Sequence, residues 1–135
     1  NAKISNQSNS DHINDGLKLK KAYITTALKC VPPEDKPLKE ELDNCFRFFN
    51  REIALLEDLK IIVALGKIAF DACKYFYKSK YNFTEKINFG HNKLYKLPNN
   101  ILLIGCYHPS PRNVNTGRIN EKKMTSLFKK VLKLV

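Results

Sequence analysis

The chain has 135 residues, of which 43% are hydrophobic, and this is enough for one domain with a modest core. Its formal net charge of +11 favours a polyanionic partner, nucleic acid first, although solubility or a lysine-rich source would also account for it. No apolar run approaches the roughly 20 residues of a membrane span, and four cysteines without a signal-peptide pattern favour a cytoplasmic protein over a disulfide scaffold.

The first half of the chain predicts a loop, a strand, an extended segment and a long helix. Residues 1–20 are polar and contain turn residues, whereas residues 22–28 are rich in β-formers and predict a strand. Three prolines exclude a helix interior from residues 29–37. Residues 38–59 form the helical segment. Its apolar stripe is Leu42, Phe46, Phe49, Ile53 and Leu56.

The second half alternates strands with helices. Residues 60–65 are apolar throughout, as in a buried parallel strand, and Gly66 turns the chain into a second helix. Residues 82–100 are mixed and leave room for a short strand, residues 101–105 predict the last strand, and residues 120–134 the last helix. The inward stripe of the second helix is Ile68, Ala69, Ala72, Cys73 and Phe76. That of the last helix is Met124, Leu127, Phe128, Val131 and Leu134.

This alternation predicts an α/β fold, a three-layer α/β/α sandwich around a mostly parallel sheet. Right-handed crossovers place the carboxyl ends of parallel strands on one edge of the sheet. The segment from Cys30 to Pro37, Gly66 and the loop after Gly105 are therefore expected on the same side.

That loop, from Gly105 to Arg118, follows a strand and precedes a helix, which is where open α/β sheets build their sites. From Ser110 to the C-terminus there are seven basic residues and one acidic residue. Taken alone, His108 is more often a histidine that bonds to backbone at a strand end than a functional group.

The loop resembles the second active-site motif of the uracil-DNA glycosylase superfamily, written H-P-S-P or H-x-S-x-x-N-x-x-T-G-R. The longer form is similar to the family-five enzymes of archaea and some thermophilic bacteria. The residues in register are His108, Ser110, Asn113, Thr116, Gly117 and Arg118. The resemblance implies a DNA-repair glycosylase that hydrolyses the N-glycosidic bond of uracil, and of other deaminated bases, after the nucleotide has been flipped out of the duplex.

The resemblance implies two catalytic residues. A neutral imidazole at His108 would hydrogen-bond the uracil O2 and stabilise the negative charge that develops on the leaving base. Water would then attack the sugar cation. Asn113 would lie in the active site beside His108, and no residue is assigned as general base.

The DNA-binding residues implied by the same motif are Ser110, Pro111, Arg112, Asn115 and Arg118. Ser110 is suited to a phosphate, and Pro111 stiffens the loop. Arg112 stands where relatives wedge into the gap left by the base, and its alternative is an exposed cation without a fixed partner. Asn115 and Arg118 would shape the loop and the helix entry, although Thr116 and Gly117 equally fit plain turn chemistry.

Cys30 and Cys45 alone are a weak signal, because buried thiols are common. In family-four and family-five glycosylases, however, a K/R-C-x-P-P run and a cysteine on the following helix supply half of a 4Fe–4S site. The run from Lys29 to Pro33 with Cys45 resembles that pattern, which implies a metal site at Cys30 and Cys45. Cys73 and Cys106 are interpreted as core, so the cluster is expected to be absent or incomplete in this chain.

The resemblance covers residues 3–135 as a single glycosylase-like domain, with residues 1–2 interpreted as a cloning remnant. Asp35 stands where relatives often have Asn. The N-terminal motif of the family, with its cysteines and first strand, has no counterpart in this sequence. We therefore expect the C-terminal part of a longer protein, inactive by itself, in which a dimer or a segment swap covers the missing strand.

Two other functions compete with a glycosylase. The first is a catalytically inactive DNA-binding fragment of the same fold, favoured by the missing motif. The second is a basic α/β module that binds a nucleotide, and no glycine-rich loop of Walker or Rossmann spacing supports it.

Overall fold

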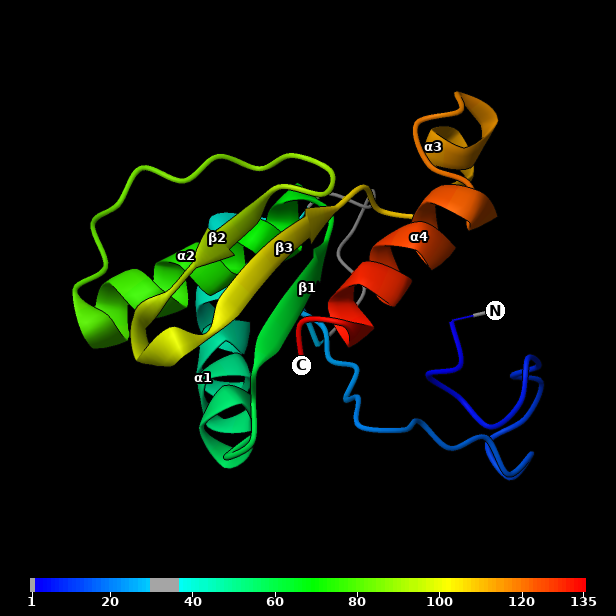
Figure 1. Ribbon diagram of the computed structural model, residues 1–135. Helices are drawn as coiled ribbons and strands as arrows, with labels where there is room; N and C mark the ends of the chain where they lie inside the picture. The colour runs from blue at the N-terminus through cyan, green and yellow to red at the C-terminus, as the bar shows by residue number, and fades with distance from the viewer. Residues whose placement is uncertain (1, 30–36) are drawn as a thin grey trace.

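The computed structural model describes residues 2–29 and 37–135. Within them lie a small mixed sheet and four α-helices, in the order drawn in Figure 1. The helices are α1 (Lys39–Leu55), α2 (Lys67–Tyr81), α3 (Pro111–Asn115) and α4 (Glu121–Leu132). The strands are β1 (Ile61–Leu65), β2 (Leu94–Lys96) and β3 (Leu102–Cys106), and a 3-10 turn at Pro98–Asn100 connects β2 to β3. No described helix combines the length and the apolar character that a membrane crossing requires.

The sheet has the order β1-β3-β2. β1 and β3 are parallel, with Ile61 opposite Leu102 and Leu65 opposite Cys106. β2 returns antiparallel along the other edge of β3, with Leu94 opposite Ile104. The expectation of parallel pairing therefore holds for the two long strands, and the short strand makes the sheet mixed.

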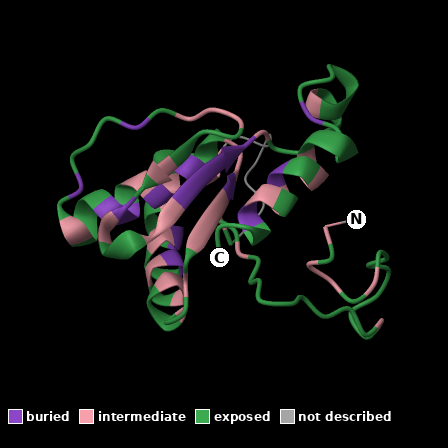
Figure 2. Cartoon of the chain, in the orientation of Figure 1, coloured by how far each residue is buried: buried purple, intermediate pink, exposed green. Residues whose placement is uncertain are grey.

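The sheet is covered on both faces, because successive side chains of a strand point to opposite sides. Ala64 and Leu103 pack with α1 and α2, whereas Ile104 and Cys106 pack with α4. In Figure 1 the helices α1 and α2 lie on one side of the sheet and α4 on the other, and Figure 2 shows the buried residues concentrated on the central strand. The three-layer α/β/α class is confirmed.

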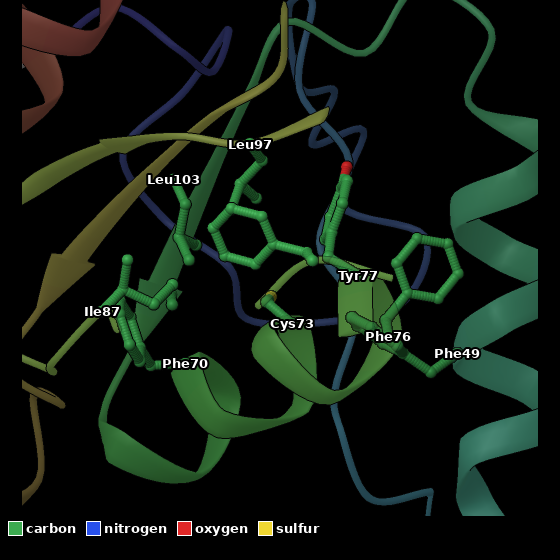
Figure 3. Packing of buried hydrophobic residues seen from close by; sticks show 10 residues of the cluster. Phe49, Phe70, Cys73, Phe76, Tyr77, Ile87, Leu97 and Leu103 are labelled. Carbon is green, nitrogen blue, oxygen red and sulfur yellow. The ribbon is translucent and has the colours of Figure 1, made fainter. Parts of the chain in front are cut away.

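The helices follow the predicted apolar stripes with three differences. Leu134 is predicted to face inward on the last helix, but α4 ends at Leu132 and Leu134 is 41% exposed, so this prediction is wrong. α1 ends at Leu55, four residues early, and its last turn carries no basic residue while Glu57 and Asp58 follow it, which is unfavourable at the negative end of the helix dipole. On α2 the inward face is rotated: Ile68 is 46% exposed, so its prediction as a core residue is wrong. Figure 3 shows Phe70 and Tyr77 inside the cluster instead. Burying these large aromatic rings removes more apolar surface from water than burying Ile68 would.

The predicted strand over residues 22–28 is not present, and this prediction is wrong. Tyr23 and Ile24 are 58% and 74% exposed, and no described segment pairs with their backbone. β-propensity describes how side chains fit a sheet surface, and it cannot form a strand without a hydrogen-bonding neighbour. The segment is tethered instead by Thr25 and Lys29, whose side chains both bond to Glu52 of α1.

Candidate active site

The site begins where β1 and β3 end side by side. The Gly66 N–H donates to the Cys106 carbonyl oxygen at 2.7 Å, which ties the two strand ends together. Gly66 has φ of +97°, a conformation that favours glycine, and a Cβ added there would lie 3.1 Å from the Cβ of His108. Gly66 and the His108 loop therefore share one edge of the sheet, as the crossover rule predicts. Residues 30–36, which were expected at the same edge, lie outside the described residues.

The motif contains a short helix, α3, where the sequence predicted only a polar loop. Ser110 is its N-cap, and the Ser110 hydroxyl accepts a hydrogen bond from the Asn113 N–H at 3.4 Å. Pro111 occupies the first turn, where proline is well tolerated. The Ser-Pro pair was the available signal for this helix, because serine favours N-caps and proline favours the next position.

Helix α3 brings Asn113 to His108. The Asn113 side-chain amide donates to the His108 carbonyl oxygen at 2.8 Å. This bond fixes the backbone of His108 from within the same loop, while the His108 side chain stays exposed above the strand end. The structure therefore brings together the two residues that sequence analysis assigned to catalysis.

The remaining motif residues form an exposed rim beside His108. Pro111, Arg112, Asn115 and Arg118 are all exposed, so each is available to a ligand. The Lys123 ammonium group of α4 donates to the carbonyl oxygens of Gly117 and Arg118, at 2.8 and 3.2 Å. The rim is therefore anchored to α4 through its backbone, which leaves the Arg118 side chain outward.

His91, which the sequence alone did not assign to the site, lies beneath this loop. The Tyr107 N–H donates to His91 Nδ1 at 3.3 Å, and the two rings stack with centroids 5.2 Å apart and 16° between their planes. Burial lowers the pKa of His91, and the neighbouring Lys123 lowers it further. Because Tyr107 directly precedes His108, this contact holds the start of the loop. It joins residues 16 positions apart, so no local pattern could have found it.

The cysteines divide into one candidate ligand and two core residues. Cys45 is buried on α1, and its sulfur accepts a hydrogen bond from the Lys29 N–H at 3.4 Å, directly before Cys30 in the chain. Burial raises the pKa of the Cys73 thiol to about 12 and also raises that of Cys106. Both lie in apolar clusters, as their interpretation as core predicts.

The described residues do not complete a cluster site. An iron–sulfur cluster takes four thiolates, and no group of three or more metal-ligating side chains gathers within residues 2–29 and 37–135. Cys45 alone among the described cysteines bonds to Lys29, the last described residue before Cys30, and Cys30 itself lies outside the described residues. The described thiols therefore do not fit a whole cluster.

Fold and site together define an α/β protein whose histidine-bearing loop stands at the carboxyl end of a parallel strand. Residues 2–133 match the family described as the uracil DNA glycosylase superfamily, and the chain belongs to that superfamily.

Its relatives include enzymes of bacteria and archaea. The chain is 34% identical over 123 residues to the type-5 uracil-DNA glycosylase of Thermus thermophilus, covering 89% of this chain and 53% of that protein. Identity is also 34% over 121 residues with the type-5 enzyme of Mycobacterium bovis, covering 89% of this chain and 44% of the relative. With that of Pyrobaculum aerophilum it is 31% over 127 residues, covering 94% and 53%. The chain thus spans about half the length of the curated relatives it matches.

Proposed function

We propose that this chain carries part of the active site of a DNA-repair glycosylase that hydrolyses the N-glycosidic bond of uracil in DNA. The observation that carries the proposal is the bond from the Asn113 amide to the His108 carbonyl, which fixes the histidine above Gly66 in a chain of this superfamily. Superfamily membership supplies the reaction class, and the loop supplies a preformed place for the base.

In this proposal His108 acts on the flipped base. A neutral imidazole donates a hydrogen bond to the pyrimidine O2 as the glycosidic bond breaks, and the fixed donor is worth more in the transition state, where negative charge has developed, than in the ground state. Asn113 orients His108 through the backbone bond and would lie beside the same base. Deaminated bases other than uracil fit the same chemistry where they carry a carbonyl oxygen at that position.

The exposed rim would hold the DNA around the flipped nucleotide. Ser110 and Pro111 present the start of α3 to a phosphate, and Arg112 and Asn115 enter or clamp the gap left by the base. Arg118 adds a cation at the end of the motif. All of these except Ser110 are exposed, which supports contact with a bulky duplex.

The proposal extends to the cofactor, the cellular location and the assembly of the enzyme. A 4Fe–4S cluster in the whole protein would use Cys30 and Cys45, and the bond from Lys29 to Cys45 supports a ligand role for Cys45. Because its substrate is chromosomal DNA, we place the enzyme in the cytoplasm of a prokaryotic cell. β1 pairs with β3 on one side, and its other edge pairs with no described strand. We propose that a dimer or a segment swap covers that edge.

A uracil-containing oligonucleotide tests the proposal. It is incubated with this chain and with a longer protein, meaning one of the relatives' full length that contains this chain, then treated with alkali, which cuts the strand at abasic sites. Scission by the longer protein supports a glycosylase, and scission by that protein but not by this chain supports the expectation that the chain is inactive by itself. Intact strands with both would remove the glycosylase proposal.

The variant His108→Ala in the longer protein should lower the rate by about 100-fold or more if His108 stabilises the leaving base. The matched control is His12→Ala, which removes an exposed histidine from the N-terminal loop and should leave the rate unchanged. Equal rates for the two variants would remove His108 from the mechanism.

A further inference from the structure

Helix α4 has two opposite faces, one packed against the sheet and one exposed. Leu127 and Val131 are buried against the sheet. On the other side, Lys122, Ser126, Lys129 and Lys133 follow one another at steps of four, three and four residues, which places them in one exposed stripe. We call these four residues the α4 stripe.

The α4 stripe lies along two adjoining hollows. A hollow of about 1030 Å³ runs beside all four stripe residues. A second, of about 320 Å³, is lined by Lys122 and Ser126 and continues to His91 and Asn92. The two hollows share Lys122 and Ser126, so they adjoin along α4, and we call them together the groove.

The three lysines of the stripe differ from other lysines nearby. Lys123 is bonded to backbone carbonyls of the motif loop, and Lys130 donates to the Asn92 side chain at 2.8 Å. On α2, Lys67 is paired with Asp71. Neither of the ion pairs found in the described residues involves Lys122, Lys129 or Lys133, so the structure leaves their charge to a ligand.

The groove suits a nucleic-acid backbone. Its lining combines ammonium groups with the hydroxyls of Thr125 and Ser126, and both groups bind phosphate oxygens in protein–DNA complexes. From Lys122 to Lys133 the helix rises about 16 Å, and one DNA strand places a phosphate about every 3.4 Å along the duplex axis. Glu121, at the first turn of α4, is the acidic residue in the lining, against four lysines.

The groove also begins close to the site. The motif ends at Arg118, α4 begins at Glu121, and the Lys123 ammonium group bonds the motif to the helix. Figure 1 shows α3 next to the beginning of α4. A strand held at Ser110 and Arg112 would therefore continue along α4.

We propose that the α4 stripe is a second DNA contact, which binds backbone phosphates of duplex DNA next to the nucleotide held by the motif loop. The inference rests on the proposed function in that DNA is the ligand. It extends that function because binding through the stripe needs neither a uracil nor catalysis.

The test is the salt dependence of binding to an undamaged 20-base-pair duplex, followed by fluorescence anisotropy between 50 and 200 mM salt. The binding constant K falls as salt rises, and each lost phosphate contact makes the slope of log K against log salt shallower by about 0.9. The triple variant Lys122→Gln, Lys129→Gln and Lys133→Gln should therefore lose about 2 to 3 slope units. Its affinity at 100 mM salt should fall by about 10-fold or more.

The matched control is Lys74→Gln, Lys78→Gln and Lys86→Gln, which removes the same charge from α2 and the loop that follows it. If net charge alone mattered, the slopes of the two triple variants would change equally, and that result would overturn the proposal. Absence of binding by the unsubstituted chain would also overturn it. Lysine and glutamine have similar helix propensities, and unchanged far-UV circular dichroism shows that α4 is intact.

A parallel arm uses a uracil-containing duplex of the same sequence with the longer protein. If abasic sites never appear while the stripe variant still shows the shallower salt dependence, the proposed glycosylase function is wrong and DNA binding by the α4 stripe is supported. If uracil is excised and the slope does not change, the stripe fails and the function stands.

Discussion

The two faces of the sheet are packed with different kinds of side chain. Towards α1 and α2 the core is aromatic: Phe49, Phe70, Phe76 and Tyr77 are buried, and Phe76 meets Phe49 and Tyr77 edge to face at 6.1 and 5.1 Å between centroids. Towards α4 the cluster is smaller and mostly aliphatic, built from Ile104, Cys106, Ile119, Leu127 and Val131.

The difference teaches how this chain separates stability from function. The aromatic face has the larger cluster of buried residues and carries none of the proposed catalytic or DNA-binding residues. The α4 side carries the motif loop, which is held by polar contacts such as those of Asn113 with His108 and of Lys123 with Gly117. Polar contacts fix geometry with little net free energy, so the loop depends on the rest of the fold for its stability.

The largest effect is expected from breaking the aromatic face. Phe76→Ala should lower the free energy of unfolding by about 4 kcal/mol, since it removes a buried ring and leaves a cavity among other rings. The matched variant on the α4 side, Leu127→Ala, should cost about 2.5 kcal/mol. Urea unfolding of both variants measures the difference. A greater loss from Leu127→Ala would reverse the comparison of the two faces.

The second-largest loss of stability is expected at Gly105, where β3 passes close to the backbone of another segment. Gly105 on β3 lies against the Gly90 backbone, and a Cβ there would overlap the Gly90 carbonyl oxygen. Two bonds hold this approach, from Asn92 N–H to the Gly105 carbonyl at 2.7 Å and from Gly105 N–H to the Lys93 carbonyl at 3.0 Å. Gly105→Ala should therefore cost about 3 kcal/mol of unfolding free energy, because backbone cannot move aside as a side chain can.

The control for Gly105 is Gly117→Ala. Gly117 has φ of +69° but open space around its Cβ position, so this variant carries only the conformational cost, about 1 kcal/mol. Thermal unfolding of both variants separates crowding from backbone strain. Equal losses would show that the close approach of Gly105 to Gly90 contributes nothing.

A smaller effect is expected at the start of α4. The Asn120 side chain accepts a hydrogen bond from the Lys123 N–H at 2.8 Å and so caps the helix. Asn120→Ala should cost about 1 kcal/mol, and Asn120→Asp, which keeps the acceptor, should cost little. Chemical unfolding of the two variants gives the comparison. A loss shared equally by both would mean that the cap bond is not what stabilises this end of α4.

Local patterns predicted most of the elements, and non-local contacts account for most of what they missed. The apolar runs at β1 and β3 and the stripes of α1 and α4 are visible over a few residues, so their positions were predicted closely. The segment at residues 22–28 has the composition of a strand, but a strand also needs a neighbour, which composition does not supply.

The candidate site was predictable in the same uneven way. His108 and Asn113 belong to one contiguous motif, so their proximity followed from the sequence. His91 reaches Tyr107 only because the turn after Phe89 folds back onto β3, and its distance along the chain hides that contact. The metal site at Cys30 and Cys45 stays a prediction.

His91 gives the smallest and most specific prediction, a pH dependence. Its Nδ1 accepts the Tyr107 N–H only when the ring nitrogen carries no proton, and burial, with Lys123 nearby, lowers the pKa of His91 below its usual value of 6.5. As pH falls through that usual value, the unfolded chain takes up the proton before the folded chain does. The free energy of unfolding should therefore fall between pH 7.5 and pH 5.5.

The variant His91→Gln isolates this dependence from that of the other two histidines. The carboxylates of Asp15 and Glu52, whose pKa values are lowered by their hydrogen bonds, titrate below this window and do not contribute to it. Urea unfolding at both pH values should show a larger loss in the unsubstituted chain than in His91→Gln. If the two chains lose the same free energy, His91 is not the neutral acceptor that holds Tyr107, and the motif loop is fixed from the side of Asn113 and Lys123 alone.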